Sequence, residues 1–375
     1  MRIALATGLL PVPPTYFALQ HGARLADEHA VRMFALATHL RDARLGVDID
    51  SVIPAVGPWP ARMATAFVSA PLAFRLQARA ITAFAPDVVH QHFATWSRGA
   101  IEAGRQAGAP LVTTLHGYDV FAAERHGGSP LARFHRRNAE ATARDAQRVL
   151  AVSRYLADRA IAAGFPAARM HVHYQGVDTD VFTPSPTRQA SAEPSLVFVG
   201  ALAERKGVRD LVEASIDAAG RAPHRLRIIG DGPLAPLVRA AAAEHPHIDV
   251  MGGLPRSRVI EVLREARALV LPTQEHQGWR EAAGLVLLEA QACGVPVVVY
   301  RSGGAPEMVD DEATGAVVAE GDRRALSSAM VELLGLSEAE HSAMSARARQ
   351  FVVESRSLSR SVTELREHYL AALEG

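Results

Sequence analysis

The sequence predicts an α/β protein built from two Rossmann-like, doubly wound domains. Short runs of Val, Ile and Leu alternate along the chain with longer amphipathic segments rich in Ala, Arg and Leu. Parallel strands covered on both faces by crossover helices give this pattern. The chain has 375 residues, 49% of them hydrophobic, which is more than one hydrophobic core usually serves. A segment with three prolines, residues 183–194, divides the pattern into two similar halves.

Strand candidates in the first half are short apolar runs with helical stretches between them. They are residues 2–6, 47–53, 87–91, 111–115, 148–152 and 171–174. Residues 2–12 also imitate a signal peptide, because an apolar run follows Arg2. The prolines that follow, and the lack of a well-placed cleavage site, favour a first β-strand instead.

The second half contains a second series of strand candidates, followed by two long helices. The strands are predicted at residues 196–199, 226–229, 248–251, 268–271, 295–299 and 316–318, and the helices at 338–354 and 358–373. We therefore predict an N-terminal domain over residues 1–183, a linker over 184–194 and a C-terminal domain over 195–355. Residues 356–375 are predicted to form a helix that packs back on the N-terminal domain.

Composition excludes several classes of protein. Lys plus Arg and Asp plus Glu are each 40, so a general nucleic-acid binder, which needs a basic surface, is not expected. The single cysteine, Cys293, allows no intrachain disulfide and favours a reducing compartment such as the cytoplasm. No apolar run reaches the roughly 20 residues of a spanning helix. An excess of about five positive charges before residue 185 suggests that any membrane contact is peripheral, at the inner face.

The loop at residues 200–207, GALAERKG, is a candidate phosphate site. It follows a predicted strand and contains Arg205 and Lys206. Lys206 is the only lysine in the chain, while the other 39 basic residues are arginines. A lysine retained at this position suggests that a compact ammonium group is needed there, and phosphate oxygens are the obvious partner. The alternative is an ordinary solvated basic loop.

Two glutamates, Glu281 and Glu289, stand eight residues apart in the segment WREAAGLVLLE. Gly284 lies where a helix is predicted to begin, so the N–H groups of Gly284 and Leu285 are available to an anion. Glu281 then precedes the helix and Glu289 lies within it. A carboxylate accepts hydrogen bonds from two neighbouring hydroxyls, which suits one glutamate to a sugar and the other to a ribose. A solvated helix face is the alternative.

The order of motifs in the second half resembles the retaining glycosyltransferases of the GT-B fold, in the GT4 group. That group has an Arg-Lys-Gly loop, a Gly-Asp-Gly-Pro turn, a Glu-x7-Glu motif and a Gly-x-Pro-Val segment. The chain has them at residues 205–207, 230–233, 281–289 and 294–297. In the first half, Leu115-His116-Gly117-Tyr118-Asp119 resembles the His-Gly-x-Asp turn of colanic-acid and amylovoran type enzymes. The resemblance implies two domains that face each other across a cleft.

The resemblance also implies roles for particular residues. Arg205 and Lys206 would bind the donor diphosphate, and the turn glycines Gly230 and Gly232 would belong to the nucleotide-sugar site. Glu281 would bind the transferred sugar, and Glu289 the ribose. On the acceptor side, His116 would line the reaction centre, together with Asp119.

Three positions depart from the family pattern. Gly8 is followed by LLPVPPTYF, where many relatives have a Gly-Gly loop that touches the diphosphate. Ala201 stands where an arginine is common, and Ala282 where glycine is common after the first glutamate. Relative to the family pattern, Ala201 leaves the site one cation short, whereas Ala282 restricts the loop without removing a catalytic group.

The same residues allow other functions, an NAD-dependent oxidoreductase among them. The segment from Gly230 to Ala235 fits the dinucleotide fingerprint G-x-G-x-x-A, but that fingerprint belongs at the first strand of its fold. The His90–His92 and His171–His173 pairs could suggest a metal site, but no third ligand is spaced to complete either pair. The two glutamates could serve a glycosidase, which would leave Lys206 unexplained. A catalytically inactive nucleotide-sugar-binding protein is a further alternative.

By this resemblance, the expected reaction moves a hexose from a UDP- or GDP-sugar to a hydroxyl of a glycan or lipid-linked acceptor. The configuration at the anomeric carbon is retained, and neither a metal nor another cofactor is expected. Cell-surface polysaccharide synthesis is the expected context, and glycosylation of a small natural product is the alternative.

Overall fold

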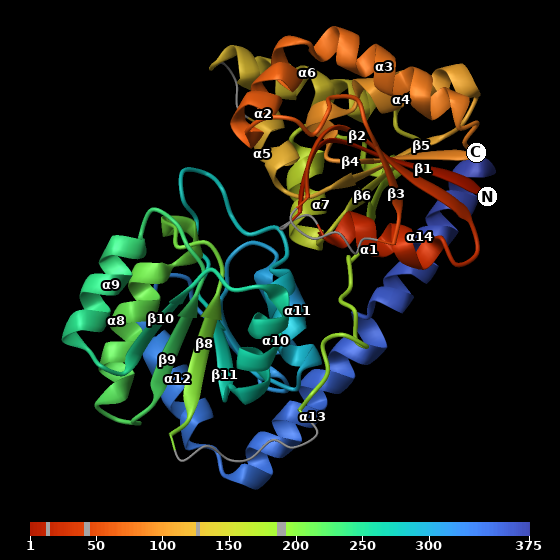
Figure 1. Ribbon diagram of the computed structural model, residues 1–375. Coiled ribbons are helices and arrows are strands. Elements are labelled where there is room, and N and C mark those ends of the chain that lie inside the picture. Colours follow the sequence, from red (N-terminus) through yellow and green to blue (C-terminus); the bar gives the residue numbers. More distant parts are fainter. Residues whose placement is uncertain (13–15, 41–45, 125–127, 186–192) are drawn as a thin grey trace. The chain divides into compact units, whose positions relative to one another are not determined.

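The computed structural model describes residues 1–12, 16–40, 46–124, 128–185 and 193–375. Most of the predicted linker, residues 186–192, lies outside these ranges. The chain divides into two compact units, residues 1–175 with 361–375, and residues 176–360. Each unit contains one parallel sheet with helices packed against it (Figure 1).

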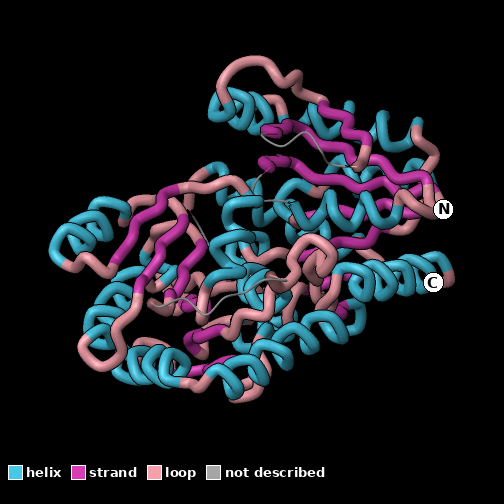
Figure 2. Tube along the Cα trace, turned by 60° about the horizontal axis from the view of Figure 1, so that its bottom comes forward, coloured by secondary structure: helices cyan, strands magenta, loops and turns pink. Residues whose placement is uncertain are grey.

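The sheet of the first unit has seven parallel strands in the order β3-β2-β1-β4-β5-β6-β7. Figure 2 shows its strands side by side. Their bounds are β1 (Arg2–Val12), β2 (Ala30–Leu40), β3 (Asp48–Ser51), β4 (Val88–His92), β5 (Leu111–Leu115), β6 (Arg148–Ala151) and β7 (Met170–Val172). The strand order reverses between β1 and β4, the position at which open α/β sheets bind ligands.

Two features of this sheet differ from the prediction. Strand β2 was not predicted, because its Ala, Leu and Met residues favour a helix by themselves. Strand β1 extends six residues beyond Ala6, although it contains Pro11. Past Ala6, β1 pairs with β2 but no longer with β4, so one edge of β1 is unpaired there. A strand with an unpaired edge tolerates Pro11, which cannot donate a backbone hydrogen bond.

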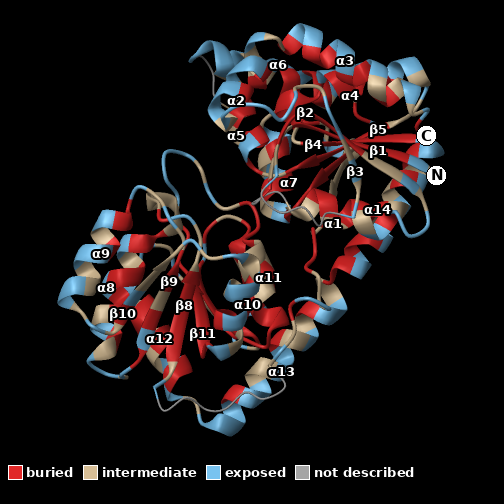
Figure 3. Cartoon of the chain, viewed as in Figure 1, coloured by how far each residue is buried: buried red, intermediate tan, exposed pale blue. Residues whose placement is uncertain are grey.

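The helices of the first unit cover both faces of its sheet. They are α1 (Tyr16–Leu25), α2 (Trp59–Val68), α3 (Ala70–Ala83), α4 (Arg98–Ala107), α5 (Tyr118–Glu124), α6 (Pro130–Asp145) and α7 (Arg154–Ala162), with the short helices η1 (Ala94–Trp96) and η2 (Ala167–Arg169). Strands β4 and β5 at the centre of the sheet are buried, the edge strand β3 is mostly exposed, and the outer helix faces are exposed (Figure 3).

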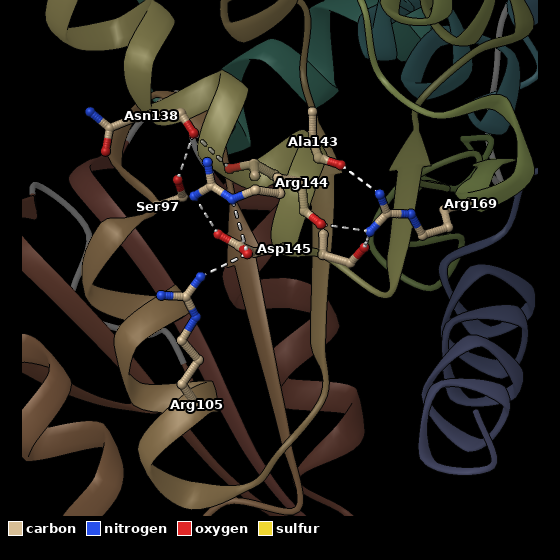
Figure 4. Close-up of polar contacts among 9 residues, drawn as sticks. Ser97, Arg105, Asn138, Ala143, Arg144, Asp145 and Arg169 are labelled. Atoms are coloured by element: carbon tan, nitrogen blue, oxygen red, sulfur yellow. Dashed lines mark hydrogen bonds and ion pairs between the residues drawn. The ribbon is translucent and has the colours of Figure 1, made fainter.

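Helix α6 is held in place by polar contacts at its C-terminal half (Figure 4). Arg105 of α4 donates to the Asp145 carboxylate at 2.8 Å. The Arg169 guanidinium donates to the carbonyls of Ala143, Arg144 and Ala146 at 2.6–3.0 Å. These carbonyls have no partner within the helix, so Arg169 caps its negative end.

The second unit has a six-stranded parallel sheet in the order β10-β9-β8-β11-β12-β13. All six predicted strands are confirmed: β8 (Ser195–Val199), β9 (Arg225–Ile229), β10 (Ile248–Gly252), β11 (Ala268–Leu271), β12 (Val297–Tyr300) and β13 (Gly315–Val318). Its helices are η3 (Glu204–Lys206), α8 (Val208–Ala219), α9 (Ala235–Glu244), α10 (Arg256–Glu265), α11 (Leu285–Ala292), η4 (Ala305–Met308), α12 (Arg323–Gly335) and α13 (Glu338–Ser355).

The last helix, α14 (Leu358–Leu373), contributes its residues from Ser361 onward to the first unit. The Tyr369 hydroxyl lies 2.7 Å from Nδ1 of His90, and Ser361 Oγ lies 3.0 Å from Nε2 of His21. Tyr369 is completely buried. The end of the chain therefore forms part of the first unit's core. No helix among the described residues is long and apolar enough to cross a membrane.

Candidate functional site

The sheet of the second unit reverses its strand order between β8 and β11, and two of the predicted site residues meet there. Lys206 follows β8 and Glu281 follows β11. The Lys206 ammonium contacts the Glu281 carboxylate directly, and both side chains are largely buried, at 17% and 13% exposed. Parallel neighbouring strands thus bring together two residues 75 positions apart.

Arg205, the neighbour of Lys206, lies against an aromatic ring. Its guanidinium carbon is 4.8 Å from the ring centroid of Trp279. Its Nε is buried and has no hydrogen-bond partner among the residues that the structure describes. Sequence reasoning did not assign Trp279 a role. Stacking holds the guanidinium in one plane and leaves N–H groups for an anion.

The turn glycines Gly230 and Gly232 allow two loops to pack backbone against backbone. A Cβ on Gly230 would lie 1.8 Å from the Gly200 carbonyl oxygen, and one on Gly232 2.6 Å from that of Leu202. Leu202 N–H also donates to the Asp231 carbonyl at 2.9 Å. The Gly-Asp-Gly-Pro turn therefore supports the loop that carries Arg205 and Lys206.

Helix α11 begins at Leu285, with Gly284 as its N-cap, as predicted. Gly284 has no side chain that could accept from the N–H groups of the first turn, and it adopts a φ of +88°. Those N–H groups are therefore available to an anion at the positive end of the helix dipole. Glu281 lies in the preceding loop and Glu289 on the helix, also as predicted.

The Glu289 carboxylate makes no hydrogen bond or ion pair with the described part of the chain. Burial raises the pKa of its carboxyl above the usual value, opposed by the charge of Arg256. A half-buried carboxylate with both oxygens unused is suited to accept hydrogen bonds from ligand hydroxyls.

The segment after β12 supports Glu281, and the sequence analysis missed it. The Gly304 N–H donates to the Glu281 carbonyl at 2.9 Å, and a Cβ on Gly303 would lie 2.2 Å from the same oxygen. The Gly303-Gly304 pair was the available signal. Only a glycine lets the backbone approach the Glu281 loop so closely.

In the first unit, His116 lies at the end of β5 among aromatic rings. Its ring centroid is 4.4 Å from those of Phe17 and Phe93. Its Nε2 is 3.2 Å from Nδ1 of His92, and its Nδ1 is 3.1 Å from the Gln175 amide. Burial, with His92 nearby, holds the pKa of His116 well below 6.5, so the imidazole is neutral at pH 7.

Asp119 is completely buried beneath the same turn. Its carboxylate accepts the N–H groups of His116, Gly117, Val120 and Ala94 at 2.9–3.3 Å. Burial raises the pKa of Asp119 to about 6, opposed by these hydrogen bonds. These contacts fix the backbone of the turn that carries His116, so Asp119 supports the position of His116.

In each histidine pair that resembled metal ligands, at least one ring is hydrogen-bonded within the protein. His90 lies 2.7 Å from Thr114 Oγ1, and His173 2.8 Å from the Ser361 carbonyl. Among the described residues, no group of three His, Cys, Asp or Glu side chains is placed to hold a metal ion.

The buried histidines should make the first unit sensitive to acid. Burial lowers the pKa of His21 and of His92 to about 3. The unfolded chain, with a pKa near 6.5, therefore binds protons first as the pH falls. Above pH 6.5 the free energy of unfolding keeps its full value, because these histidines are neutral in both states. By pH 5.5 the free energy of unfolding falls by about 1.4 kcal/mol per histidine.

Urea unfolding at pH 7.5 and 5.5 measures this loss. We expect His21→Gln to reduce the difference in the free energy of unfolding between pH 7.5 and pH 5.5. The control His39→Gln, at the partly exposed end of β2, should leave that difference unchanged. Equal stability of the wild-type protein at both pH values would contradict the prediction.

Two family models match most of the chain. The first half, residues 16–181, matches "Glycosyltransferase Family 4", and residues 193–335 match "Glycosyl transferases group 1". Each match lies within one half of the chain.

Curated relatives agree with these matches. The GDP-mannose-dependent alpha-(1-6)-phosphatidylinositol monomannoside mannosyltransferase of Mycolicibacterium smegmatis is 35% identical over 247 residues, 61% of this chain and 62% of that protein. The putative colanic acid biosynthesis glycosyltransferase WcaL of Escherichia coli is 29% identical over 282 residues, 72% of this chain and 67% of that protein. The chain thus spans about two thirds or less of these relatives' length.

Among solved structures, Anabaena Alr3699/HepE in complex with UDP is similar over 99% of this chain and 100% of its own. The TM-score is 0.78 and the sequence identity 16%, so this likeness concerns the fold.

Proposed function

Because the chain belongs to the GT-B glycosyltransferases of the GT4 group, we propose that it transfers a hexose from a UDP- or GDP-sugar to an acceptor hydroxyl. The observation that carries the proposal is the contact between Lys206 and Glu281, beside an N-cap that leaves helix N–H groups unused. A sugar diphosphate offers partners to each: phosphate oxygens to the cation and the N–H groups, and hydroxyls to the carboxylate.

Bond cleavage places negative charge on the β-phosphate. Four groups are positioned for this charge before the reaction: the side chains of Lys206 and Arg205 and the N–H groups of Gly284 and Leu285. They would therefore stabilise the charge that develops on the β-phosphate in the transition state more than they stabilise the ground state. The Lys206 ammonium has three N–H donors, and Glu281 takes one, which leaves others for phosphate oxygens. These groups would do without a metal what a divalent ion does in metal-dependent transferases.

In this proposal the reaction retains the anomeric configuration without an enzyme nucleophile. Glu281 is paired with Lys206, which disfavours attack by its carboxylate and favours binding of sugar hydroxyls. The departing phosphate then helps to deprotonate the acceptor on the same face of the sugar. His116, neutral and held by His92 and Gln175, would line the reaction centre from the first unit.

The acceptor is proposed to be a glycan or a lipid-linked sugar of cell-surface polysaccharide synthesis. Relatives named for colanic acid biosynthesis and for a phosphatidylinositol mannoside support this class. A small natural product is the second candidate acceptor, and an inactive sugar-nucleotide-binding protein the alternative to an enzyme.

Peripheral contact with the cytoplasmic face of a membrane is proposed through a groove in the first unit. This arginine groove, of about 1,040 Å³, lies between α3, α4 and α6. Arg75, Arg79, Arg98 and Arg137 line it without hydrogen bonds or ion pairs to any described residue. Val68, Leu72 and Leu76, on the adjoining helices, are 41–81% exposed. Exposed apolar residues beside cations are typical of surfaces that bind anionic lipids.

Two measurements test the proposed function. Thermal unfolding with a panel of nucleoside diphosphates should identify one that raises Tm in proportion to RT ln(1 + [L]/Kd), while nicotinamide cofactors should not. The corresponding sugar nucleotide should then give a product with retained anomeric configuration by NMR, at an unchanged rate in excess EDTA. An inverted product, or complete loss in EDTA that magnesium restores, would contradict the proposed mechanism.

A further inference from the structure

A second pocket of the first unit has chemistry that the donor site does not explain. It has a volume of about 550 Å³ and lies at the carboxyl ends of β1, β4 and β5. This volume is within the roughly 300–1,000 Å³ of small-molecule sites. Its walls are mainly hydrocarbon and aromatic, from β1, α2, α6 and the loop after β4, and include Leu9, Met63, Phe67, Trp96 and Leu131.

The Phe93 ring connects the pocket to His116, which does not itself line the pocket. Phe93 lines the pocket, and its ring centroid is 4.4 Å from that of His116. Tyr118, two residues after His116, lines it as well. A molecule with a hydroxyl at His116 would therefore have its remaining atoms within reach of the apolar walls.

One polar group in these walls lacks a partner. His135 lines the pocket and is only 5% exposed. Its Nδ1 lies 3.3 Å from the Tyr118 hydroxyl, but its Nε2 has no hydrogen-bond partner among the described residues. The Nε2 atom is not exposed to the pocket, so the walls offer an occupant chiefly apolar contacts.

The pocket also borders the arginine groove, because Phe67 lines both. A hydrocarbon chain that leaves the pocket past Phe67 would reach the four arginines of the groove whose side chains have no partner among the described residues. A lipid in an anionic membrane would place its hydrocarbon chain in the apolar pocket and the membrane phosphates near the arginines. A soluble glycan has no apolar group to contact the pocket walls.

We propose that this pocket binds the lipid part of the acceptor, next to the sugar or hydroxyl that receives the hexose. The inference rests on the proposed function, since it names the acceptor class of that reaction. Leu131, Met63 and Phe67 are then residues that determine acceptor specificity.

The test compares an octyl glycoside, below its micelle-forming concentration, with the methyl glycoside of the same sugar. We expect the octyl compound to bind at least tenfold more tightly, measured by calorimetry, because only its chain fills the pocket. Leu131→Asp should weaken octyl-glycoside binding at least tenfold. Ile161→Asp is the matched control, since Ile161 on α7 is 38% exposed, against 39% for Leu131, and lines neither the pocket nor the arginine groove.

Transfer kinetics then separate this inference from the proposed function. With a donor, Leu131→Asp should raise KM for the octyl acceptor and leave kcat and nucleotide binding unchanged. Equal affinity for the octyl and methyl compounds, or no effect of Leu131→Asp, would overturn the inference even if transfer occurs. Leu131-dependent octyl binding without transfer from any donor would instead reject the proposed function alone.

Discussion

Replacement of Lys206 by alanine is expected to lower kcat by about 100-fold or more at saturating donor. This is the usual effect of removing one fixed group that stabilises transition-state charge. The substitution also leaves Glu281 without its cation, so both the leaving group and the sugar site lose support. Lys206→Arg should recover part of the lost kcat, because it restores the positive charge but replaces the compact ammonium with a larger, planar guanidinium.

The matched control is Arg209→Ala. Arg209 lies one turn away at the start of α8, is exposed and pairs only with Glu204 in the described contacts. We expect its removal to change kcat by less than twofold, since exposed ion pairs contribute little. Near-normal turnover of Lys206→Ala, with wild-type Tm and saturating donor, would show that Lys206 does not act on the leaving group.

The two glutamates should respond differently to alanine. Glu289→Ala is expected to weaken binding of both the intact donor and the free nucleoside diphosphate, by about 1.5–3 kcal/mol, because charge-assisted hydrogen bonds to the ribose are lost. Glu281→Ala should not weaken binding of the free nucleoside diphosphate, because the substitution leaves the Lys206 ammonium free to contact the phosphates. Its kcat/KM with the intact donor should fall by about 100-fold or more through lost sugar positioning.

Calorimetry with the free diphosphate and steady-state kinetics distinguish the two glutamates. Glu332→Ala, which removes an exposed carboxylate on α12, is the control and should change neither measurement. Equal weakening of free-diphosphate binding by Glu281→Ala and Glu289→Ala would place the sugar end of the site elsewhere.

The sequence by itself determined the fold class and the local structure around most of the candidate site residues. The second sheet was predictable strand by strand, because its strands are short, continuous apolar runs between turn residues. The helix start at Gly284 was predictable from the glycine before an apolar run, which also placed Glu281 in a loop and Glu289 on a helix. These features depend on local patterns, and local patterns are present in the sequence.

Tertiary structure decided the features that depend on neighbours distant in the chain. Strand β2 has the residues of a helix and becomes a strand because it pairs with β1 along ten positions. The Lys206–Glu281 contact joins residues 75 apart, and follows from the placement of β8 beside β11. The Arg205–Trp279 stacking and the apolar pocket at Phe67 and Leu131 likewise arise only once separate elements are packed. Sequence patterns encode how one segment folds, whereas partners across a sheet are chosen by which buried faces fit together.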